Sequence, residues 1–365
     1  MTGPEAARLF YSPEHFQRAG AQPGRVQKVL FGKTGVQHLD DGAHRFRKEM
    51  ILPLMTPERV WDLRHINASL WEGYADLWTV KDRILLYPQL REMLARAVCQ
   101  WAGVHLKECE IPARTEQLSA QFHGAGAFGF KYWRARTLRK RADTWAQQII
   151  REIRFRRLAP ESRAAHVIAF WRDPSGNLLD PYTAGVELLN ILRPTVAVAI
   201  FIAFAAHAMH QYPEVRAGLR DENYIEMFAQ EVRRFYPFFP ALIAQTTHEF
   251  IWNGLEFPAH TRTMLDIYGT NHDPRAWRDP DQFVPERFKN GSATPFNFIP
   301  QGGGDAHTGH RCPGEFIALE LIKLAVKFMT TEITYVVPDQ NLKINFRHAP
   351  ATIESGFVLS NVRRV

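Results

Sequence analysis

Apolar residues recur with helical spacing over most of the first half of the chain. Residues 57–101 and 118–157 carry apolar positions at i, i+3 and i+4, which is the pattern of amphipathic helices. Prolines and glycines predict where these helices break, at Pro88, Gly103, Pro112 and residues 124–126. Short helical pieces and turns alternate over residues 4–28. We therefore expect the first half of the chain to be entirely helical.

Residues 187–210 are apolar on nearly every face, which is typical of a helix through the middle of a large domain. Arg193 and Pro194 are the exceptions inside this segment. An internal proline removes a helical hydrogen bond at a cost of about 3 kcal/mol, so we expect a kink there. The longest uninterrupted apolar run, residues 196–206, is much shorter than the roughly 20 residues of a membrane span. No membrane span is predicted.

Strand signals are concentrated in the last third of the chain. Residues 247–252 alternate, Asn253-Gly254 predicts a turn, and residues 262–268 predict a strand, the only clear β region before the C-terminus. Strand-like segments at 342–346 and 356–359 follow, and helices are predicted at 221–235 and 313–330. The pattern predicts one domain over residues 1–365, mainly α with a minor β part.

Composition excludes a disordered or low-complexity chain, because 45% of the residues are apolar and 23% are charged. The net charge is +7, with 34 arginines against 11 lysines. The densest basic stretch runs from Lys131 to Arg157 with the spacing of a helix surface. A solvated helical face is the favoured interpretation, with a nucleic-acid or membrane surface as the alternative. We expect no nucleic-acid partner.

The three cysteines, Cys99, Cys109 and Cys312, are too few for a disulfide framework. This indicates a reducing compartment, and no charged-then-apolar signal segment opens the chain. We therefore expect a cytoplasmic protein in which Cys99 and Cys109 are structural.

The sharpest local pattern is the segment 299–315, IPQGGGDAHTGHRCPGE. Pro313 suits the first position of a helix, so Cys312 is expected at or just before its start, where free N–H groups lower a thiol's pKa. A thiolate as axial ligand lets a haem iron cleave an O–O bond, and His310 and Arg311 are then candidates to meet the haem propionates. A zinc site of His307, His310 and Cys312 is the competing interpretation, but it lacks the spacing of common zinc modules. A plain buried cysteine is the other alternative, which leaves the glycines unexplained.

Glu231 and Arg234 lie one turn apart on a predicted helix, where they can pair with each other and with Arg287 of the Pro-Glu-Arg-Phe segment. The same spacing at Glu5 and Arg8 has a solvated surface pair as its default interpretation. The position of Glu231 upstream of the Pro-Glu-Arg-Phe segment and the cysteine loop favours a buried structural network.

Three elements follow one another along the chain: the Glu231–Arg234 pair, the Pro-Glu-Arg-Phe segment and the cysteine loop. With these elements in this order, the chain resembles a cytochrome P450. Four segments narrow the resemblance to the hydrogen-peroxide-using fatty-acid P450s, the bacterial and fungal peroxygenases: VQKVLFGK at 26–33, LRPTVAVA at 192–199, YGTNHDPR at 268–275 and PQGGGD at 300–305. The resemblance covers essentially the whole chain. It implies a P450 fold without the family's first helix and strands, haem b on Cys312, a long-chain fatty acid and hydrogen peroxide as reactants, and no redox partner protein.

Two departures from ordinary P450s support the narrower resemblance. Asp305 stands where those proteins carry phenylalanine, and Arg193-Pro194 replaces the acid–alcohol pair that delivers protons to dioxygen. A general acid–base group typically contributes about 10²–10⁴-fold, so another group must supply this function. A buried guanidinium requires an anion, and a carboxylate matches its fork. A fatty acid held by Arg193 would place its own carboxylate at the reaction site, with Cα and Cβ nearest the oxidising group. The alternative is that Arg193 pairs with Glu187 or a backbone carbonyl.

The resemblance implies roles for four further residues. Gln37 occupies the place of a histidine in some members and cannot relay a proton as imidazole does, which favours hydroxylation over decarboxylation. A loop glutamine bonded only to backbone is the alternative. Phe31 is implied as a substrate contact, and His44 and Lys48, at i and i+4, resemble the pair that binds a haem propionate. A solvated helix face would show the same spacing.

The expected function is a soluble thiolate-haem peroxygenase that hydroxylates fatty acids at Cα or Cβ, with Arg193, Pro194 and Gln37 at the catalytic site. Three alternatives stay open: a fatty-acid decarboxylase that forms terminal alkenes, a P450 fed by a reductase, and a non-enzymatic haem or fatty-acid carrier.

Overall fold

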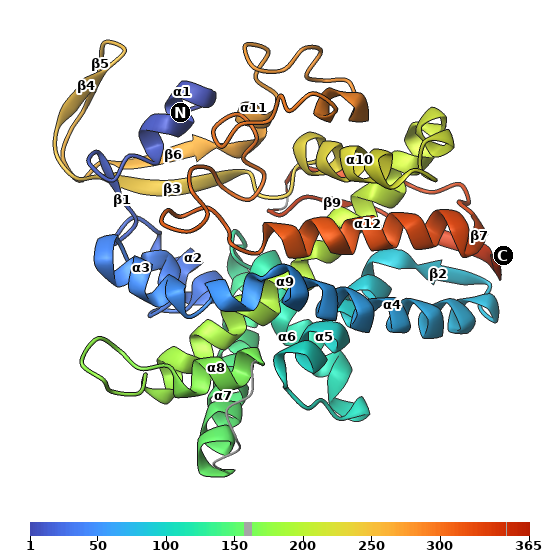
Figure 1. The fold of residues 1–365 in the computed structure, drawn as a ribbon, viewed down its shortest axis with the longest axis horizontal. Coiled ribbons are helices and arrows are strands. Elements are labelled where there is room, and N and C mark those ends of the chain that lie inside the picture. Colours follow the sequence, from blue (N-terminus) through green and yellow to red (C-terminus); the bar gives the residue numbers. More distant parts are fainter. Residues whose placement is uncertain (157–162, 348) are drawn as a thin grey trace.

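The molecule is organised around one long central helix. The computed structural model describes residues 1–156, 163–347 and 349–365, so Arg157 of the basic stretch lies outside the described residues. Helix α9 (Pro181–Gln211) crosses the middle of the fold, and the Asp180 side chain caps its start by accepting from two backbone N–H groups (Figure 1). The helices packed against it are α5 (Leu86–Ala102), α6 (Ile111–His123), α7 (Gly129–Arg156), α8 (Ala164–Phe170), α10 (Glu222–Phe235) and α12 (Glu315–Thr331).

Helix α9 is long and apolar enough to cross a membrane by length and composition alone. Its most apolar window has a mean hydropathy of 2.0, but 94% of that window is buried inside the protein. The helix is therefore the core element that the apolar pattern of residues 187–210 predicts, extended by one and a half turns at its start. Pro194 lies inside it and cannot donate to the carbonyl of Asn190.

The remaining helices complete the layers around this core. Helix α4 (Pro57–Thr79) packs on α5 and α12. The shorter helical segments are α1 (Pro4–Phe10), α2 (Gly24–Val26), η1 (Gln27–Phe31), η2 (Val36–His38), α3 (Asp41–Glu49), η3 (Leu52–Met55), η4 (Glu108–Glu110), η5 (Pro213–Ala217), α11 (Ile267–Asn271) and η6 (Pro285–Phe288).

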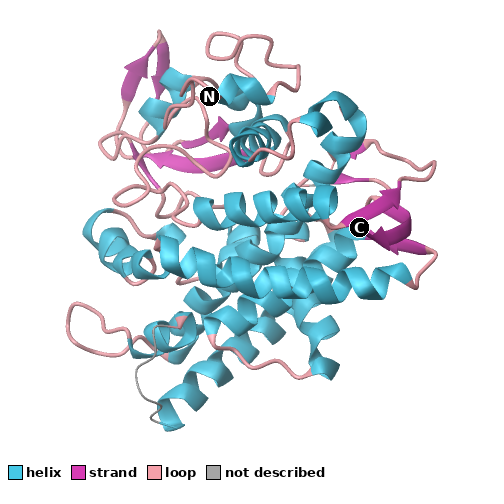
Figure 2. Ribbon diagram, turned by 45° about the vertical axis from the view of Figure 1, so that its right-hand side comes forward, coloured by secondary structure: helices cyan, strands magenta, loops and turns pink. Residues whose placement is uncertain are grey.

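Small antiparallel sheets lie at the periphery of the helical body (Figure 2). One has the order β1–β3–β6 and another β2–β10–β7, and two hairpins pair β4 with β5 and β8 with β9. Asn253 and Gly254 form the turn of the β4–β5 hairpin with φ values of 51° and 76°, as an Asn-Gly pair predicts. The strands are β1 (Phe16–Gln17), β2 (Arg83–Leu85), β3 (Ala241–Thr246), β4 (Phe250–Trp252), β5 (Leu255–Phe257), β6 (Arg262–Asp266), β7 (Ile333–Val336), β8 (Ile344–Asn345), β9 (Thr352–Ile353) and β10 (Val358–Arg364).

Two expectations about the strands are wrong. The first half of the chain is not entirely helical, because β1 and β2 lie in it, and residues 247–268 are therefore not the only β region before the C-terminus. β1 and β2 are two and three residues long and pair with β3 and β10, more than 200 residues away. A strand this short carries no periodic signal, since distant partners rather than local pattern select its conformation.

Glu231, Arg234 and Arg287 form a buried network between α10 and η6. Arg234 donates to both oxygens of Glu231 at 2.7 and 2.8 Å, and Arg287 Nε donates to Glu231 Oε1 at 3.1 Å. The backbone N–H of Val284 donates to the same oxygen at 2.8 Å. The side chains of Glu231 and Arg234 are fully buried. The network therefore fixes the irregular segment 271–288 against α10.

We predict that Glu231→Ala lowers the free energy of unfolding by about 3–5 kcal/mol, because it leaves two arginines without their shared carboxylate. Soluble yield and the denaturant midpoint measure the effect. Glu226→Ala is the matched control, because Glu226 lies on the same helix with a half-exposed side chain that pairs with Lys323. A Glu231→Ala protein that unfolds at the control's midpoint would contradict the prediction.

Candidate active site

A deep cavity lies between α9, the cysteine loop and residues 11–55. Its volume is about 290 Å³, close to the lower end of the roughly 300–1000 Å³ of ordinary small-molecule pockets. The cavity is therefore large enough to be a ligand site. The sequence-predicted residues that line it are Phe31, Gln37, His44, Lys48, Arg193, Pro194, His310, Arg311 and Cys312.

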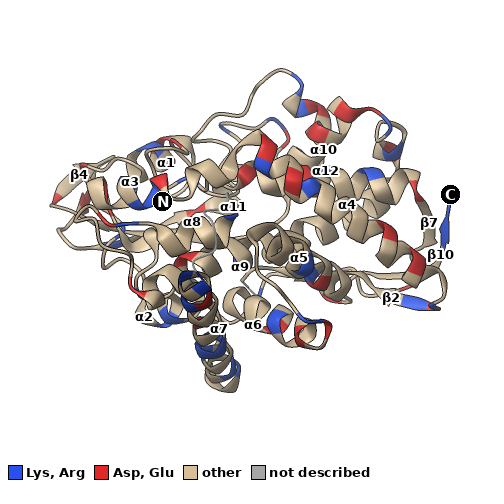
Figure 3. Cartoon of the chain, turned by 60° about the horizontal axis from the view of Figure 1, so that its bottom comes forward, with Lys and Arg blue, Asp and Glu red and all other residues tan. Residues whose placement is uncertain are grey.

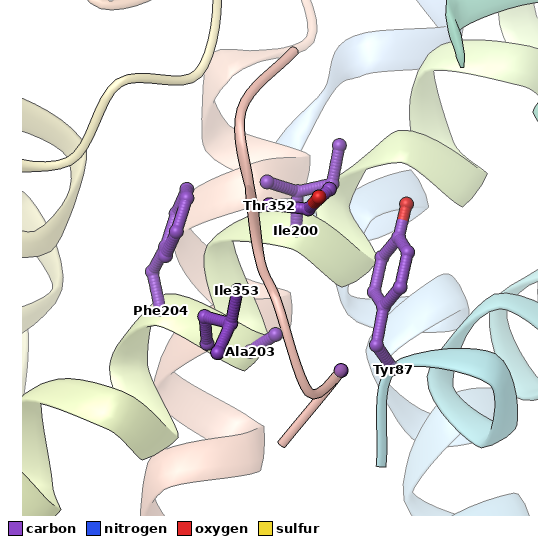
Figure 4. Close-up of a pocket in the computed structure, with 7 residues that line it drawn as sticks. Tyr87, Ile200, Ala203, Phe204, Thr352 and Ile353 are labelled. Carbon is purple, nitrogen blue, oxygen red and sulfur yellow. The ribbon is translucent and has the colours of Figure 1, made fainter. Parts of the chain in front are cut away.

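A second, far smaller cavity is a packing gap. It measures about 10 Å³ and lies between Ile200, Ala203 and Phe204 of α9 and the strand residues Thr352 and Ile353 (Figure 4). This is about the space of one water molecule, and its lining is apolar except for Tyr87 and Thr352. It brings no candidate chemical groups together.

The glycines before Cys312 give its loop the path that places the thiol in the cavity. Gly302 has φ of 96°, in the left-handed region that favours glycine. A Cβ on Gly303 would lie 2.8 Å from the Pro295 carbonyl oxygen, so a side chain there would displace the loop. The Cys312 N–H donates to the Gln301 carbonyl at 3.2 Å, which closes the loop on itself.

The expectation that a helix start lowers the pKa of Cys312 is wrong. Helix α12 begins at Glu315 with Gly314 as its N-cap, so both Cys312 and Pro313 lie outside the helix. Burial raises the pKa of the Cys312 thiol, and nearby Glu315 raises it further. The Gly314 N–H and the cations Lys48 and Arg233 act in the opposite direction. The position of the thiol, rather than its ionisation, is what the chain fixes.

His44, Lys48 and His310 gather beside the cysteine loop. Lys48 Nζ donates to the carbonyls of Gly309 and Arg311, the latter at 3.0 Å, and the His44 and His310 rings lie 4.0 Å apart. His44 and Lys48 are 4% and 3% exposed, so they are not part of a solvated helix face. Burial lowers the pKa of Lys48 to about 8, and burial together with His310 lowers the pKa of His44 to about 3.

Arg311 lines the cavity with its guanidinium already paired. It donates to Glu315 Oε2 at 2.8 and 3.0 Å. Its charge is therefore partly neutralised before any ligand binds. His310 Nε2 likewise lies 3.3 Å from Asp40 Oδ1.

Arg18 and Tyr11 line the same cavity, and neither was identified from the sequence pattern. Arg18 is 7% exposed, and its guanidinium lies over the ring of Tyr11 at 5.3 Å. Tyr11 Oη is buried, and its proton has no acceptor among the described residues, although the Gly303 N–H lies close to its oxygen. A buried donor without an acceptor is costly unless a ligand supplies one. A thiol, a glycine-rich loop, buried cations and this orphaned hydroxyl together fit a flat macrocycle that carries carboxylates, as haem does.

Arg193 is buried in the wall of the cavity, and no carboxylate of the described residues serves as its counter-ion. Its Nη1 donates to the Leu30 carbonyl and, at 3.0 Å, to Asn190 Oδ1. Within residues 1–156, 163–347 and 349–365, no carboxylate forms an ion pair with it, and Nε and Nη2 donate no hydrogen bond. Burial and the charge on Arg139 together lower the pKa of Arg193 to about 9, while the charges of Glu187 and Cys312 act in the opposite direction.

The alternative in which Arg193 pairs with Glu187 is wrong, because Glu187 Oε1 accepts from Arg47 at 2.8 Å. The alternative of a backbone carbonyl partner is correct for one guanidinium nitrogen, because Nη1 donates to the Leu30 carbonyl. Arg193 lines the cavity, and its other nitrogens remain as donors for a ligand there.

Asn190 joins Gln37 to Arg193. Its Nδ2 donates to Gln37 Oε1 and to Glu187 Oε2, each at 3.2 Å, while its Oδ1 accepts from Arg193. Gln37 therefore bonds to a side chain of α9 and not only to backbone. Glu187, Asn190 and Arg193 are spaced three apart on an otherwise apolar helix, and this spacing was a signal that sequence reasoning missed.

The zinc alternative for the cysteine loop has no ligand set. In the part of the chain that the structure describes, no three His, Cys, Asp or Glu side chains are arranged to hold a metal ion. Cys312 is therefore the thiol of a cavity rather than a corner of a metal cluster.

Comparisons with known proteins place these residues in a family. The cytochrome P450 family model matches residues 195–347. Two curated relatives are cytochrome P450 3A11 of Mus musculus, 28% identical over 34% of this chain, and cytochrome P450 71D18 of Mentha gracilis, 27% identical over 45% of it. The matched stretch spans only 28% and 35% of those proteins.

Similar solved structures extend the match over the whole chain. Cytochrome P450SP alpha (CYP152B1) in complex with (R)-ibuprophen is 46% identical with a TM-score of 0.97, covering 100% of this chain and 90% of that one. Cytochrome P450EX alpha (CYP152N1) with myristic acid is 40% identical with a TM-score of 0.96, covering 100% and 89%.

A variant of cytochrome P450 OleT in complex with arachidonic acid is 34% identical with a TM-score of 0.96, covering 100% of this chain and 88% of that one. The helical body, the minor sheets and the cysteine loop are thus those of a known fold. The chain belongs to the cytochrome P450 family of haem oxidoreductases, in the same group as P450SP alpha, P450EX alpha and OleT, the peroxygenase group that its sequence resembles.

Proposed function

We propose that this chain is a peroxygenase that uses hydrogen peroxide to hydroxylate long-chain fatty acids at Cα or Cβ. The observation that carries the proposal is the buried guanidinium of Arg193, which lies in the wall of the cavity that holds the Cys312 thiol and pairs with no carboxylate of the described residues. Thiolate-ligated haem supplies O–O bond cleavage and oxygen insertion when it is bound. The similar structures determined with myristic and arachidonic acid support a fatty-acid ligand for this cavity.

The chain's own residues would hold haem b in this cavity. Cys312 would supply the sulfur ligand of the iron, which its place in the cavity and the glycine loop support. Lys48, His44, His310 and Arg18 are proposed to meet the propionates, because they are buried or half-buried polar groups on one stretch of the wall. Arg311 would contribute less than these, since Glu315 already neutralises it.

Arg193 would bind the fatty carboxylate through the donors that the fold leaves free. A bidentate pair with a carboxylate neutralises a charge whose burial is otherwise unfavourable. Phe31, whose ring lies 5.7 Å from the guanidinium carbon, would then contact the first methylene groups of the substrate.

The lining of the cavity supports a proton-handling role for the substrate. Among the described residues that line it there is no aspartate or glutamate, and the Thr195 hydroxyl is engaged with the Ile191 carbonyl at 3.0 Å. Hydroxylation by peroxide converts a C–H bond and H₂O₂ into an alcohol and water, with no net proton uptake. A carboxylate held by Arg193 would accept a proton from one peroxide oxygen and return it to the other.

The same geometry bears on the alternatives. An ordinary reductase-fed P450 carries an acid–alcohol pair for proton delivery, and none of the described residues that line this cavity is an aspartate or a glutamate. A carrier would show no turnover with peroxide. Decarboxylation is the closest alternative, and Gln37 favours hydroxylation over it. The Gln37 amide is held by Asn190 and does not exchange a proton near neutral pH. The unpaired cysteines support a reducing, cytoplasmic location.

We predict that Cys312→Ser abolishes the red-shifted Soret band of the reduced carbon monoxide complex, because serine cannot supply a thiolate. Cys99→Ser, at a buried thiol outside the cavity, is the control and should keep the band. If Cys99→Ser loses the band and Cys312→Ser keeps it, the ligand assignment is wrong.

We predict that Arg193→Ala keeps haem but lowers peroxide-driven oxidation of fatty acids by about 10²–10⁴-fold, the usual contribution of a general acid–base group. Product formation with a series of fatty acids measures the loss. Thr195→Val is the matched control on the same wall, and it should stay within about threefold of the parent, since its hydroxyl bonds only within the helix. Parent-level turnover by Arg193→Ala would refute substrate-assisted catalysis and favour the reductase-fed alternative.

We predict that Gln37→His raises the share of terminal alkene among the products, because imidazole can exchange a proton beside the carboxylate. Gas chromatography with mass spectrometry separates alkene from hydroxy acid. A parent enzyme that forms mostly alkene would overturn the assignment to Gln37.

A further inference from the structure

A second buried arginine shares a hydrogen-bond acceptor with Arg193. Figure 3 shows basic residues along α7, and most of them are exposed, but Arg139 is fully buried. The interpretation of the basic stretch as a solvated helical face is therefore wrong for this residue. Arg139 Nη1 donates to the Leu30 carbonyl at 2.9 Å, and the same oxygen accepts from Arg193 Nη1. Two cations, one from α7 and one from α9, thus meet at one backbone oxygen.

The guanidinium of Arg139 is held from several sides. Its Nε donates to Asp143 Oδ1 at 2.7 Å, and its Nη1 also donates to the Val29 carbonyl at 3.3 Å and to Gln121 Oε1 of α6 at 3.1 Å. Arg139 therefore ties α6 and α7 to the end of η1. A carbonyl oxygen has two lone pairs, so the Leu30 oxygen can accept from Arg139 and Arg193 at once.

Gly32, the residue after η1, makes room for this arginine. It has φ of 81°, and a Cβ on it would lie 2.6 Å from Arg139 Nη2 and 2.8 Å from Val186 Cγ1. Nη2 itself is buried and has no hydrogen-bond partner among the residues that the structure describes. A buried donor without an acceptor is costly, so an apolar side chain would pack here at a lower cost. Packing alone does not account for an arginine at this position.

We propose that Arg139 is a positioning residue for the substrate carboxylate and acts from behind the wall of the cavity. It fixes the direction of the Leu30 carbonyl, and this carbonyl holds Arg193 with its other donors available to a ligand in the cavity. Arg139 is not among the residues that line the cavity, so it acts through Leu30 and Arg193 without touching the ligand. The proposal rests on the proposed function, because it requires that Arg193 binds the carboxylate.

Loss of Arg139 would weaken the binding of an acid in particular. The Leu30 carbonyl would lose its second donor, and Arg193, a long side chain with many rotamers, would keep only Asn190 as a fixed partner. Asp143 would lose its cation and remain as a negative charge behind the wall. Each change disfavours a carboxylate at Arg193, and neither affects an uncharged ligand with the same alkyl chain.

The test compares tetradecanoic acid with 1-tetradecanol in calorimetric titrations of the haem-loaded protein without peroxide. We define the acid preference as the Kd of the alcohol divided by the Kd of the acid. For the parent it should be about a hundredfold, because only the acid forms a charge-assisted bidentate pair. Arg193→Ala should abolish it. Arg139→Met should lower it by about tenfold, the usual size of a coupling within one hydrogen-bond network, with the Kd of the alcohol within about threefold of the parent's.

Arg139→Lys separates position from charge. It keeps a cation beside Asp143, but an ammonium lacks the planar fork that reaches Asp143 and the two carbonyls together. We expect this variant to lower the acid preference by about threefold or more. It also keeps the proposal testable if Arg139→Met does not fold. Circular dichroism and the carbon monoxide spectrum establish the fold of each variant.

Arg154→Met is the matched control, because Arg154 lies on the same helix and donates to the carbonyls of Ala169 and Leu179 at 2.7 and 2.8 Å. Neither carbonyl belongs to a residue that lines the cavity, so its acid preference should stay within about twofold of the parent's. A parent without acid preference contradicts the proposed function together with this inference. If the parent and Arg193→Ala behave as expected, the inference alone is overturned by a folded Arg139 variant that keeps the parent's preference or weakens acid and alcohol equally.

Discussion

The arrangement of this protein depends on one buried, uncompensated cation. Arg193 lies in the most apolar helix of the molecule and is only 5% exposed, where an unpaired charge costs several kcal/mol. The Leu30 carbonyl and the Asn190 amide lower that cost, and none of the carboxylates that the structure describes pairs with Arg193. The burial that lowers the pKa of Arg193 to about 9 would make an anionic ligand favourable at this point. Under the proposed function, the cavity would select acids through this one cation.

The neighbouring charges are arranged so that this preference survives. Glu187 lies six residues before Arg193 on α9, and its carboxylate would neutralise the Arg193 charge if the two paired. Instead, Arg47 of α3 forms an ion pair with Glu187. Asn190 lies between the two and bonds to both, so it separates the ion pair from the free cation. It also holds Gln37 by its side-chain oxygen. One amide therefore sets the position of the cation and of the residue proposed to decide the product.

The parts of this site that could be predicted from the sequence are those whose residues lie within a few positions of one another. The cysteine loop, the Arg193-Pro194 pair and the Glu231–Arg234 spacing each fall within a few residues, and the structure brings the first two to one cavity. Arg18 and Tyr11 were invisible because they come from short turns without periodicity and reach the cavity only through tertiary packing. The strands β1 and β2 were missed for the same reason, since partners more than 200 residues away define them.

The Cys312 thiol is a case in which a prediction from the local sequence is wrong for a physical reason. A cysteine followed by proline reads as the start of a helix and hence as an acidic thiol, yet Cys312 lies outside α12, and burial outweighs the favourable dipoles and raises its pKa. A metal ion deprotonates a coordinating thiol outright, so the polypeptide has no need to do so in advance. What the chain must supply is a fixed, buried sulfur, with Lys48 and Arg233 near enough to lower the cost of its charge. If Cys312 is the haem ligand, as proposed, the burial that raises the pKa of the free thiol is the same burial that fixes the sulfur at its place in the cavity.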